Sequence, residues 1–253
     1  MNSVQESPPV SRFAESLFDL LDHVSYRRID LEDLFDPVYR LRYEAYRREE
    51  FVPINSQRIT RDEFDGQPNA MGYGVYIHDV LVSSLRIHHA SATQRFSPSL
   101  TVFPEVLQPL LDEGVSFIDP TRFTADRDAS LAYPALPFLT LRIAAMASEY
   151  FRANLCLSSV RPEHAPFYRR VFGSEKLSEE RYYPGLAFPM CLYAAKVQTI
   201  RDRVADRFPF FTSLPEEREA LFGPRGEGHA IAPTARLAQR LEVLRADRAS
   251  ERT

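Results

Sequence analysis

The sequence of 253 residues contains no tryptophan and only two cysteines, Cys156 and Cys191. Each cysteine lies within an apolar run, so a disulfide scaffold is not indicated and both are expected to be buried thiols in a reducing compartment. No stretch approaches the roughly 20 apolar residues that cross a bilayer, and residues 1–10 lack the basic start and apolar segment of a signal peptide. These absences predict a cytoplasmic protein.

The sequence also lacks an excess of positive charge and lacks histidines or cysteines spaced to bind a metal. Lys and Arg number 31 against 35 Asp and Glu, a formal net charge of -4, so no general attraction to nucleic acid is expected. The six histidines include no pair spaced for a metal, and His88 and His89 would point to opposite faces of a strand. No metal site is therefore predicted.

A regular succession of helix and strand patterns is present instead. Residues 1–25 form an N-terminal extension with an amphipathic helix, because Phe13, Leu17 and Leu21 share one face. Residues 26–197 are expected to form the main domain, and 198–223 a helical C-terminal extension. Residues 224–253 are rich in Gly, Pro, Ala and Arg, which favours a mobile tail over a short helix.

The main domain predicts an α/β (α+β) fold. The strand patterns at 71–78 and 80–90 indicate an antiparallel hairpin, whereas the strand–helix–strand order of 115–160 favours a parallel crossover. A mixed central sheet with helices on both faces follows. Pro120 lies inside one strand and predicts a bulge, an edge or the end of regular pairing there.

Four short motifs carry a resemblance to a known family. The element order resembles the GNAT acyl-CoA N-acyltransferase fold, and the motifs resemble those of acyl-homoserine-lactone synthases and long-chain N-acyl amino acid synthases. In order along the chain they are RLRYEAYRREEF (40–51), RDEFD (61–65), SSLRIH (83–88) and FIDPTRF (117–123). The resemblance spans residues 37–123 with the family's order and rough spacing.

The later part of the chain looks more like the N-acyl amino acid synthases, through EHAPFYRRVF and RYYPGLAFP. Lactone synthases typically carry a tryptophan facing S-adenosylmethionine, and this chain has none. The resemblance thus implies transfer of a long acyl chain from an acyl carrier protein thioester to the α-amino group of a free amino acid. Acyl-phosphopantetheine would be the co-substrate, with no tightly bound cofactor. A lactone synthase and a non-catalytic acyl-carrier-binding module remain alternatives.

The resemblance also implies a catalytic pair. Asp119 occupies the family's acidic position and would accept a proton from the ammonium, provided that burial raises its pKa from about 3.9. Tyr168 lies where such enzymes often keep a tyrosine that protonates the leaving thiolate. The structural alternatives are a buried ion pair of Asp119 with Arg122 and a packing role for Tyr168.

Further residues are expected to bind the substrates. An arginine fork could bind the carboxylate of an amino acid, and an aspartate could bind its ammonium group. The structural alternative is an ion-pair cluster that only organises this part of the fold. The charged set is Arg42, Asp62, Asp65, Arg86 and Arg122. His164 could contact the carrier arm or serve the helix that it starts.

A basic rim would steer an acidic carrier protein. The expected docking residues are Arg161, Arg169 and Arg170, with Arg142 and Arg152 on the preceding helix. The helices at 103–111 and 136–147 could line an acyl tunnel or fill the core. A lipid product could hold the protein near a membrane, and the oligomeric state is not indicated.

Overall fold

The computed structural model describes residues 12–182, 188–224 and 228–250. Within these ranges a single sheet runs through the molecule in the order β6-β7-β5-β4-β3-β2-β1-β8. The strands are β1 (Val24–Ile29), β2 (Ala70–Ile77), β3 (Val80–Ala90), β4 (Phe117–Ala125), β5 (Leu155–Val160), β6 (Glu175–Tyr182), β7 (Pro189–Lys196) and β8 (Ala230–Ile231).

The pairing confirms the predicted mixed sheet. β2 and β3 form the expected antiparallel hairpin, and β1 and β4 extend it on either side, also antiparallel. β4 and β5 are parallel and are joined by a crossover connection that contains α6 (Leu136–Tyr150), as the strand–helix–strand order predicts. β5 then pairs antiparallel with β7, which pairs with β6.

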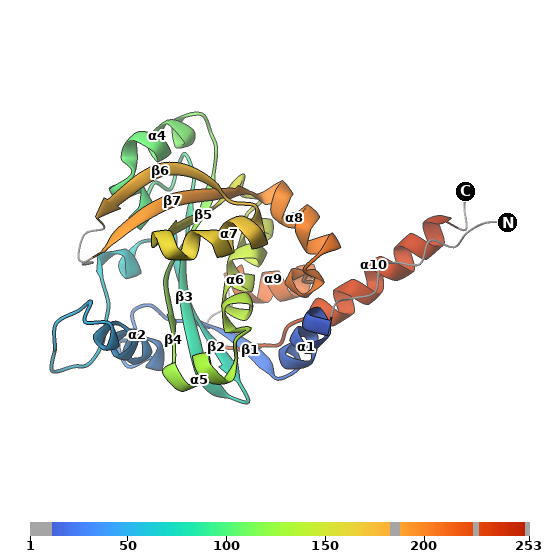
Figure 1. The fold of residues 1–253 in the computed structure, drawn as a ribbon, viewed down its shortest axis with the longest axis horizontal. Coiled ribbons are helices and arrows are strands. Elements are labelled where there is room, and N and C mark those ends of the chain that lie inside the picture. The colour runs from blue at the N-terminus through green and yellow to red at the C-terminus, as the bar shows by residue number, and fades with distance from the viewer. Residues whose placement is uncertain (1–11, 183–187, 225–227, 251–253) are drawn as a thin grey trace.

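Helices cover both faces of the sheet (Figure 1). On one face lie α1 (Arg12–Leu21), α5 (Arg127–Ala132), α6, α7 (Ala165–Phe172), α8 (Val197–Asp206), α9 (Pro215–Phe222) and α10 (Ala235–Ser250). On the other lie α2 (Pro37–Arg48), α3 (Pro98–Val102) and α4 (Pro104–Asp112). Three short 3-10 helices are also described: η1 (Glu63–Gly66), η2 (Pro162–His164) and η3 (Pro209–Phe211).

Local sequence signals set several helix ends near the later site. The Asp36 carboxylate accepts a hydrogen bond from the Val38 N–H, and Pro37 occupies the first helical position of α2. Ser97 and Pro98 start α3 in the same way. Gly173 closes α7 with φ of 68°, a left-handed conformation that glycine adopts without steric cost.

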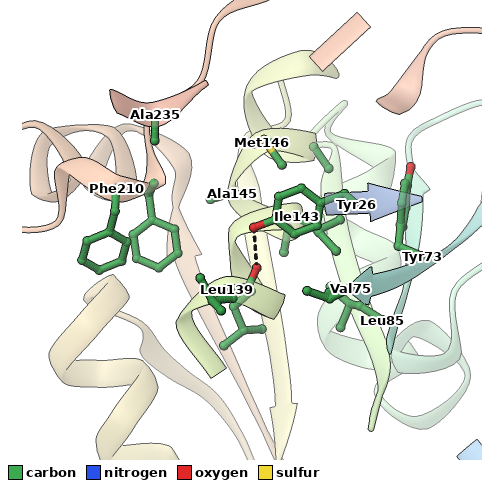
Figure 2. Packing of buried hydrophobic residues seen from close by; sticks show 14 of the residues in the cluster. Tyr26, Tyr73, Val75, Leu85, Leu139, Ile143, Ala145, Met146, Phe210 and Ala235 are labelled. Atoms are coloured by element: carbon green, nitrogen blue, oxygen red, sulfur yellow. Dashed lines mark hydrogen bonds between the residues drawn. The ribbon is translucent and has the colours of Figure 1, made fainter. Parts of the chain in front are cut away.

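The larger core packs α6 against β2 and β3 (Figure 2). Tyr26 is fully buried there, and its hydroxyl donates to the Leu139 carbonyl oxygen at 2.9 Å, so its one polar atom is satisfied. A second cluster lies beneath α3 and α4. Phe117 faces that second cluster and the adjacent Ile118 faces the first, which is the alternation expected of a strand buried on both sides.

β4 and β5 part soon after they meet. They pair only at Phe117 with Leu155 and Ile118 with Cys156, although β4 continues to Ala125 and β5 to Val160. Beyond this point β4 stays with β3 and β5 stays with β7. Pro120, which has no N–H to donate, lies where the pairing has stopped, as predicted.

A β-bulge follows on β4. The pairing of β3 with β4 shifts so that Arg122 and Phe123 together oppose the single residue Leu85. Arg122 has φ of 54°, in the left-handed region that side chains other than glycine rarely adopt. A bulge of this kind turns a side chain away from the regular alternation of a strand.

The chain after residue 223 departs from the expected mobile tail. β8 pairs with β1, and α10 contributes Ala235 and Ala238 to the buried core before it extends away from the sheet (Figure 1). The Ala and Arg content that indicated a tail is also compatible with a helix. Residues 225–227 and 251–253 of that predicted tail, and residues 1–11 of the N-terminal extension, lie outside the described ranges.

Arg142 corrects another expectation. It does not belong to a basic rim: its guanidinium is fully buried on α6 and forms a bidentate ion pair with Glu217 of α9. It also donates to the carbonyl oxygens of Phe210 and Thr212 at 2.9 and 2.6 Å. Glu217 in turn accepts hydrogen bonds from the backbone and hydroxyl of Thr234. This link fastens the C-terminal extension to the core.

In the part of the chain that the structure describes, no helix combines the length and apolar character that spanning a membrane requires.

Candidate active site

A cavity of about 710 Å³ opens where β4 and β5 part. This volume lies within the usual range of small-molecule sites, about 300–1,000 Å³. Residues 120–125 of β4 and 157–160 of β5 form two walls, and side chains from α2, α6 and α7 close the rest. The predicted disruption of the sheet therefore coincides with a cavity.

Part of the cavity lining is apolar. Leu85, Phe123, Leu141 and Phe167 contribute to its lining. A void of about 20 Å³ lies beside it and shares Pro120, Leu141, Leu157, Ser158 and Tyr168 with it. Of the two helices considered for an acyl tunnel, α6 does line the cavity, whereas α4 fills the second core cluster.

Asp119 comes directly before Pro120 of the cavity wall, and its carboxyl group is bonded to serines and not to the charged set. Its side chain is fully buried on the α3 side of the sheet. It accepts hydrogen bonds from the Ser97 hydroxyl at 2.5 Å, the Ser99 hydroxyl at 2.7 Å and the Ser99 backbone N–H at 3.0 Å. Burial raises the pKa of Asp119, and the hydrogen bonds from the two serines oppose that rise. Serines, and not an arginine, therefore hold this carboxyl group, contrary to the ion-pair alternative.

Tyr168 is placed to reach the cavity. It lies on α7, is half-buried and lines both the cavity and the adjacent void. Burial raises the pKa of its hydroxyl above the ordinary value of 10, and the nearby Cys156 adds to the rise. The phenol therefore stays protonated near neutral pH and can donate a hydrogen bond into the cavity.

The five charged residues form one continuous network. Asp65 pairs with Arg42 at 2.8 Å and with Arg86 at 3.0 Å. Arg86 also pairs with Asp62, which is shared with Arg122. Asp62 is the N-cap of η1, and the Asp65 carboxylate accepts from the Asp62 backbone N–H in return. The sign of the charge thus alternates along this chain of contacts, which runs from Arg42 through Asp65, Arg86 and Asp62 to Arg122.

Arg86 and Arg122 lower the pKa of Asp62 by more than burial raises it. Burial alone would raise the pKa of this carboxyl, but hydrogen bonds and charge from Arg86 and Arg122 hold the pKa well below its usual range. Asp62 is therefore ionised near neutral pH. Arg122 also places its guanidinium 5.3 Å from the centre of the Tyr46 ring, a cation–π contact.

The five residues expected to bind substrate differ in their access to the cavity. Arg42, Asp65 and Arg86 are fully buried and bonded to one another or to Asp62, so they form the ion-pair cluster named as the alternative. Arg122 is the one member that lines the cavity. Asp62 retains 21% exposure of its side chain beside it.

Of the residues expected to contact the carrier protein or its arm, some line the cavity and others lie outside it. His164 is exposed at the end of η2 and lines the cavity, as does Arg161, which pairs with Glu163 and lies over the Phe188 ring. Arg169 and Arg170 are exposed on α7 outside the cavity lining. The motif RYYPGLAFP is only partly visible, since residues 183–187 lie outside the described ranges.

The sequence analysis did not predict the serines that lie near Asp119. Ser97, Ser99 and Ser159 surround or adjoin Asp119, but they are 20 to 40 residues from it. The only local signal was Ser97-Pro98, which marks a helix start and not a site. Among the described residues, no group of three or more His, Cys, Asp and Glu side chains could hold a metal ion.

Comparison with known families gives a decisive match. The sequence profile of the N-acyl amino acid synthase FeeM matches residues 37–196. The chain belongs to the FeeM family of N-acyl amino acid synthases. It is therefore an acyltransferase with a GNAT-like fold, as the four motifs indicated.

Solved structures agree with the FeeM family's fold. FeeM, an N-acyl amino acid synthase from uncultured soil microbes, is 18% identical, with a TM-score of 0.58 over 71% of this chain and 94% of FeeM. MesI, a CoA-dependent acyl-homoserine lactone synthase, is 15% identical, with a TM-score of 0.52 over 71% and 93%. The lactone synthase LasI is 14% identical, with a TM-score of 0.50 over 69% and 89%. A comparison with curated proteins gives no match.

Proposed function

We propose that this protein moves a long acyl chain from the phosphopantetheine thioester of an acyl carrier protein to the α-amino group of a free amino acid. Membership of the FeeM family supports an N-acyl amino acid as the product. The observation that carries the proposal is the cavity of about 710 Å³ between the parting strands β4 and β5. Main-chain groups freed from pairing there can bind the amides of a pantetheine arm.

The cavity lining includes groups that suit both substrates. Its apolar part, with Leu85, Leu141 and Phe167, suits a hydrocarbon chain. Its charged part, with Arg122 beside the partly exposed Asp62, suits the carboxylate and ammonium of an amino acid. The thioester would then lie between them, near Pro120 and Tyr168.

The chemistry requires three things at that point. The amine must lose a proton before its lone pair attacks the thioester carbon, and the developing oxyanion needs a hydrogen-bond donor. The departing thiolate needs stabilisation as the C–S bond breaks. Asp119 is the proposed base and Tyr168 the proposed hydrogen-bond donor to the thiolate. No metal or redox cofactor is required by this sequence of steps.

The carrier-protein donor is proposed from the surface around the cavity mouth. Arg161 lies in the mouth, and Arg169 and Arg170 are exposed on the helix beside it. Such a cluster complements the acidic surface of an acyl carrier protein. Coenzyme A presents the same pantetheine arm without that surface, so the donor must be tested directly.

Purified protein should therefore be incubated with long-chain acyl carrier protein or with the matching acyl-CoA, in each case with all twenty amino acids. Mass spectrometry should detect an amide with at least one amino acid, formed faster from the carrier protein. A complete lack of amide from both donors would refute the proposal. Consumption of S-adenosylmethionine with lactone formation would instead identify a lactone synthase, and acyl-carrier binding without turnover a non-catalytic module.

A further inference from the structure

A line of hydroxyl groups connects the buried carboxyl of Asp119 with the cavity wall. The Ser99 hydroxyl donates to Asp119 Oδ1 at 2.7 Å, and the same Ser99 oxygen lies 2.6 Å from the hydroxyl oxygen of Ser159. Ser159 lies on β5 and lines the cavity, whereas Ser99 and Asp119 are fully buried. The line thus joins the buried Asp119 to a residue of the cavity wall.

The hydrogen-bond directions along this line are fixed by proton counting. An ionised Asp119 can only accept, so the single proton of Ser99 is directed to it. Ser99 must then accept from Ser159, which leaves the Ser159 oxygen free to accept a hydrogen bond from a group in the cavity. If Asp119 is protonated, each hydroxyl can rotate and the directions reverse. Both states keep every buried hydroxyl bonded.

Asp119 has no shorter described route to the substrates. Its second oxygen, Oδ2, is occupied by the Ser97 hydroxyl and the Ser99 N–H, and the side chain does not line the cavity. A base must reach its proton directly or through one intervening group or chain of groups. The serine line supplies that connection at hydrogen-bond distances throughout.

We propose that Ser159 and Ser99 form a proton relay that lets Asp119 deprotonate the amine of the acyl acceptor. An N–H proton of the ammonium passes to Ser159 Oγ, the Ser159 proton passes to Ser99 Oγ, and the Ser99 proton passes to Asp119, which becomes a neutral acid. The freed lone pair forms the C–N bond, and collapse of the oxyanion breaks the C–S bond. The amide nitrogen gives its extra proton to the departing thiolate, which leaves as the thiol, and the first proton returns from Asp119 along the same line to solvent.

The environment of Asp119 suits this role. Burial raises its pKa toward that of a useful base, and α3 holds both Ser97 and Ser99 in place through its N-cap geometry. Ser159 and Ser99 are positioning and relay residues, since only Ser159 would touch the substrate. The proposal rests on the proposed amide-forming function, because it assigns how the proton leaves that amine.

The test compares Ser159→Ala, Ser99→Ala and the double variant with wild type and with Ser159→Thr, which keeps a hydroxyl. Each alanine variant should lower kcat/KM at neutral pH by about 100-fold, the lower end of a general-base contribution, and the double variant should be no worse than either single one. The defect should shrink as the pH rises, because the amine then arrives deprotonated. Ser159→Thr should retain most activity, and Ser130→Ala, on exposed α5, all of it.

Additive losses, a defect independent of pH, or equal activity of Ser159→Ala and wild type would overturn the relay. A second measurement does not need turnover: the infrared carbonyl band of protonated Asp119, assigned by its loss in Asp119→Asn, should move in Ser159→Ala because the bond from Ser99 changes. An unmoved band would count against the line of hydroxyls. If wild type forms no amide, the proposed function fails while the infrared result still decides the connection.

Discussion

Arg122 reaches Asp62 from a left-handed backbone conformation, with φ of 54°, on the bulge of β4. Its Nε and Nη2 atoms both bond to Asp62 Oδ2, so the fork is anchored at one carboxylate oxygen. Backbone strain of this kind persists where the surroundings over-determine it, and it gathers at functional sites. Here the surrounding bulge, the Tyr46 ring and the shared carboxylate all hold one side chain at the cavity wall.

Arg122→Lys should therefore impair recognition of the acyl acceptor more than folding. A lysine keeps the charge but cannot reproduce the fork, so the KM for the amino acid should rise by about 10-fold, equivalent to about 1.4 kcal/mol. Steady-state kinetics with varied amino acid and fixed acyl donor would measure this. The exposed Arg40→Lys is the control, and an unchanged KM in Arg122→Lys would remove this residue from the acceptor site.

Tyr168→Phe should have a modest effect. The raised pKa of the phenol makes full proton transfer to a thiolate, whose conjugate thiol has a pKa of about 8.5, unfavourable, so only a hydrogen bond is lost. We expect kcat to fall by about 10-fold with little change in thermal stability, since phenylalanine fills the same space. Release of the carrier thiol, followed with a thiol reagent, would measure it. A loss of several orders of magnitude would indicate an obligatory acid.

The double variant Arg169→Glu/Arg170→Glu separates the two possible donors. Reversing both charges should raise the KM for acyl carrier protein by about 10-fold at low salt and leave acyl-CoA turnover nearly unchanged. The difference should diminish as added salt screens the surface charges. Arg95→Glu, far from the cavity and exposed, is the matched control. Equal effects on both donors would argue against carrier docking on α7.

His88 should make the fold sensitive to acid. Burial, and then the charge of Arg86, lower the pKa of this imidazole to about 3, and its Nε2 lies 3.0 Å from the Phe64 carbonyl oxygen. The unfolded chain binds a proton below pH about 6.5 that the folded chain refuses, so stability falls as the pH drops from 6.5 toward 3. Relative to His88→Gln, wild type should lose about 1.4 kcal/mol of unfolding free energy per pH unit in this window. Denaturant titrations at several pH values would show it, and parallel curves would contradict it.

The buried pair of Arg142 and Glu217 should be strongly coupled. Glu217→Gln leaves a guanidinium without a counter-ion in the core and should reduce unfolding free energy by about 3–5 kcal/mol, whereas Arg142→Met combined with Glu217→Met should cost less than either single change. The exposed pair offers the control: Asp112→Asn, which breaks the contact with Arg95, should change stability by less than about 1 kcal/mol. Calorimetric or denaturant unfolding would measure these variants. Additive single effects would contradict the coupling.

Much of the fold was visible in the sequence because the governing signals are local. Hydrophobic periodicity marked the β2–β3 hairpin and α6, and Pro120 marked the end of regular pairing on β4. β6 was missed because its sequence, EKLSEERY, is charged and almost entirely exposed. A charged edge strand of this kind avoids pairing with other chains, and it carries no apolar alternation that a sequence could display.

The site was harder to predict because its partners meet only in three dimensions. The motifs brought the five charged residues into view as a set, but which of them is buried depends on how η1 packs beneath β3 and β4. Arg86 and Arg122 look equivalent in sequence, yet one is fully buried and the other reaches the cavity through the bulge. The serines near Asp119 carry no local pattern that distinguishes them from other serines.

The region shared with the FeeM family ends at residue 196, but residues beyond it hold α6 in place. That helix lines the cavity through Leu141, and the next residue, Arg142, is held by Glu217 and, through it, Thr234. A transplant of residues 37–196 would carry the whole catalytic cavity and abandon the counter-ion of its supporting helix. A segment that keeps the buried charge of Arg142 neutralised must therefore extend at least to Thr234.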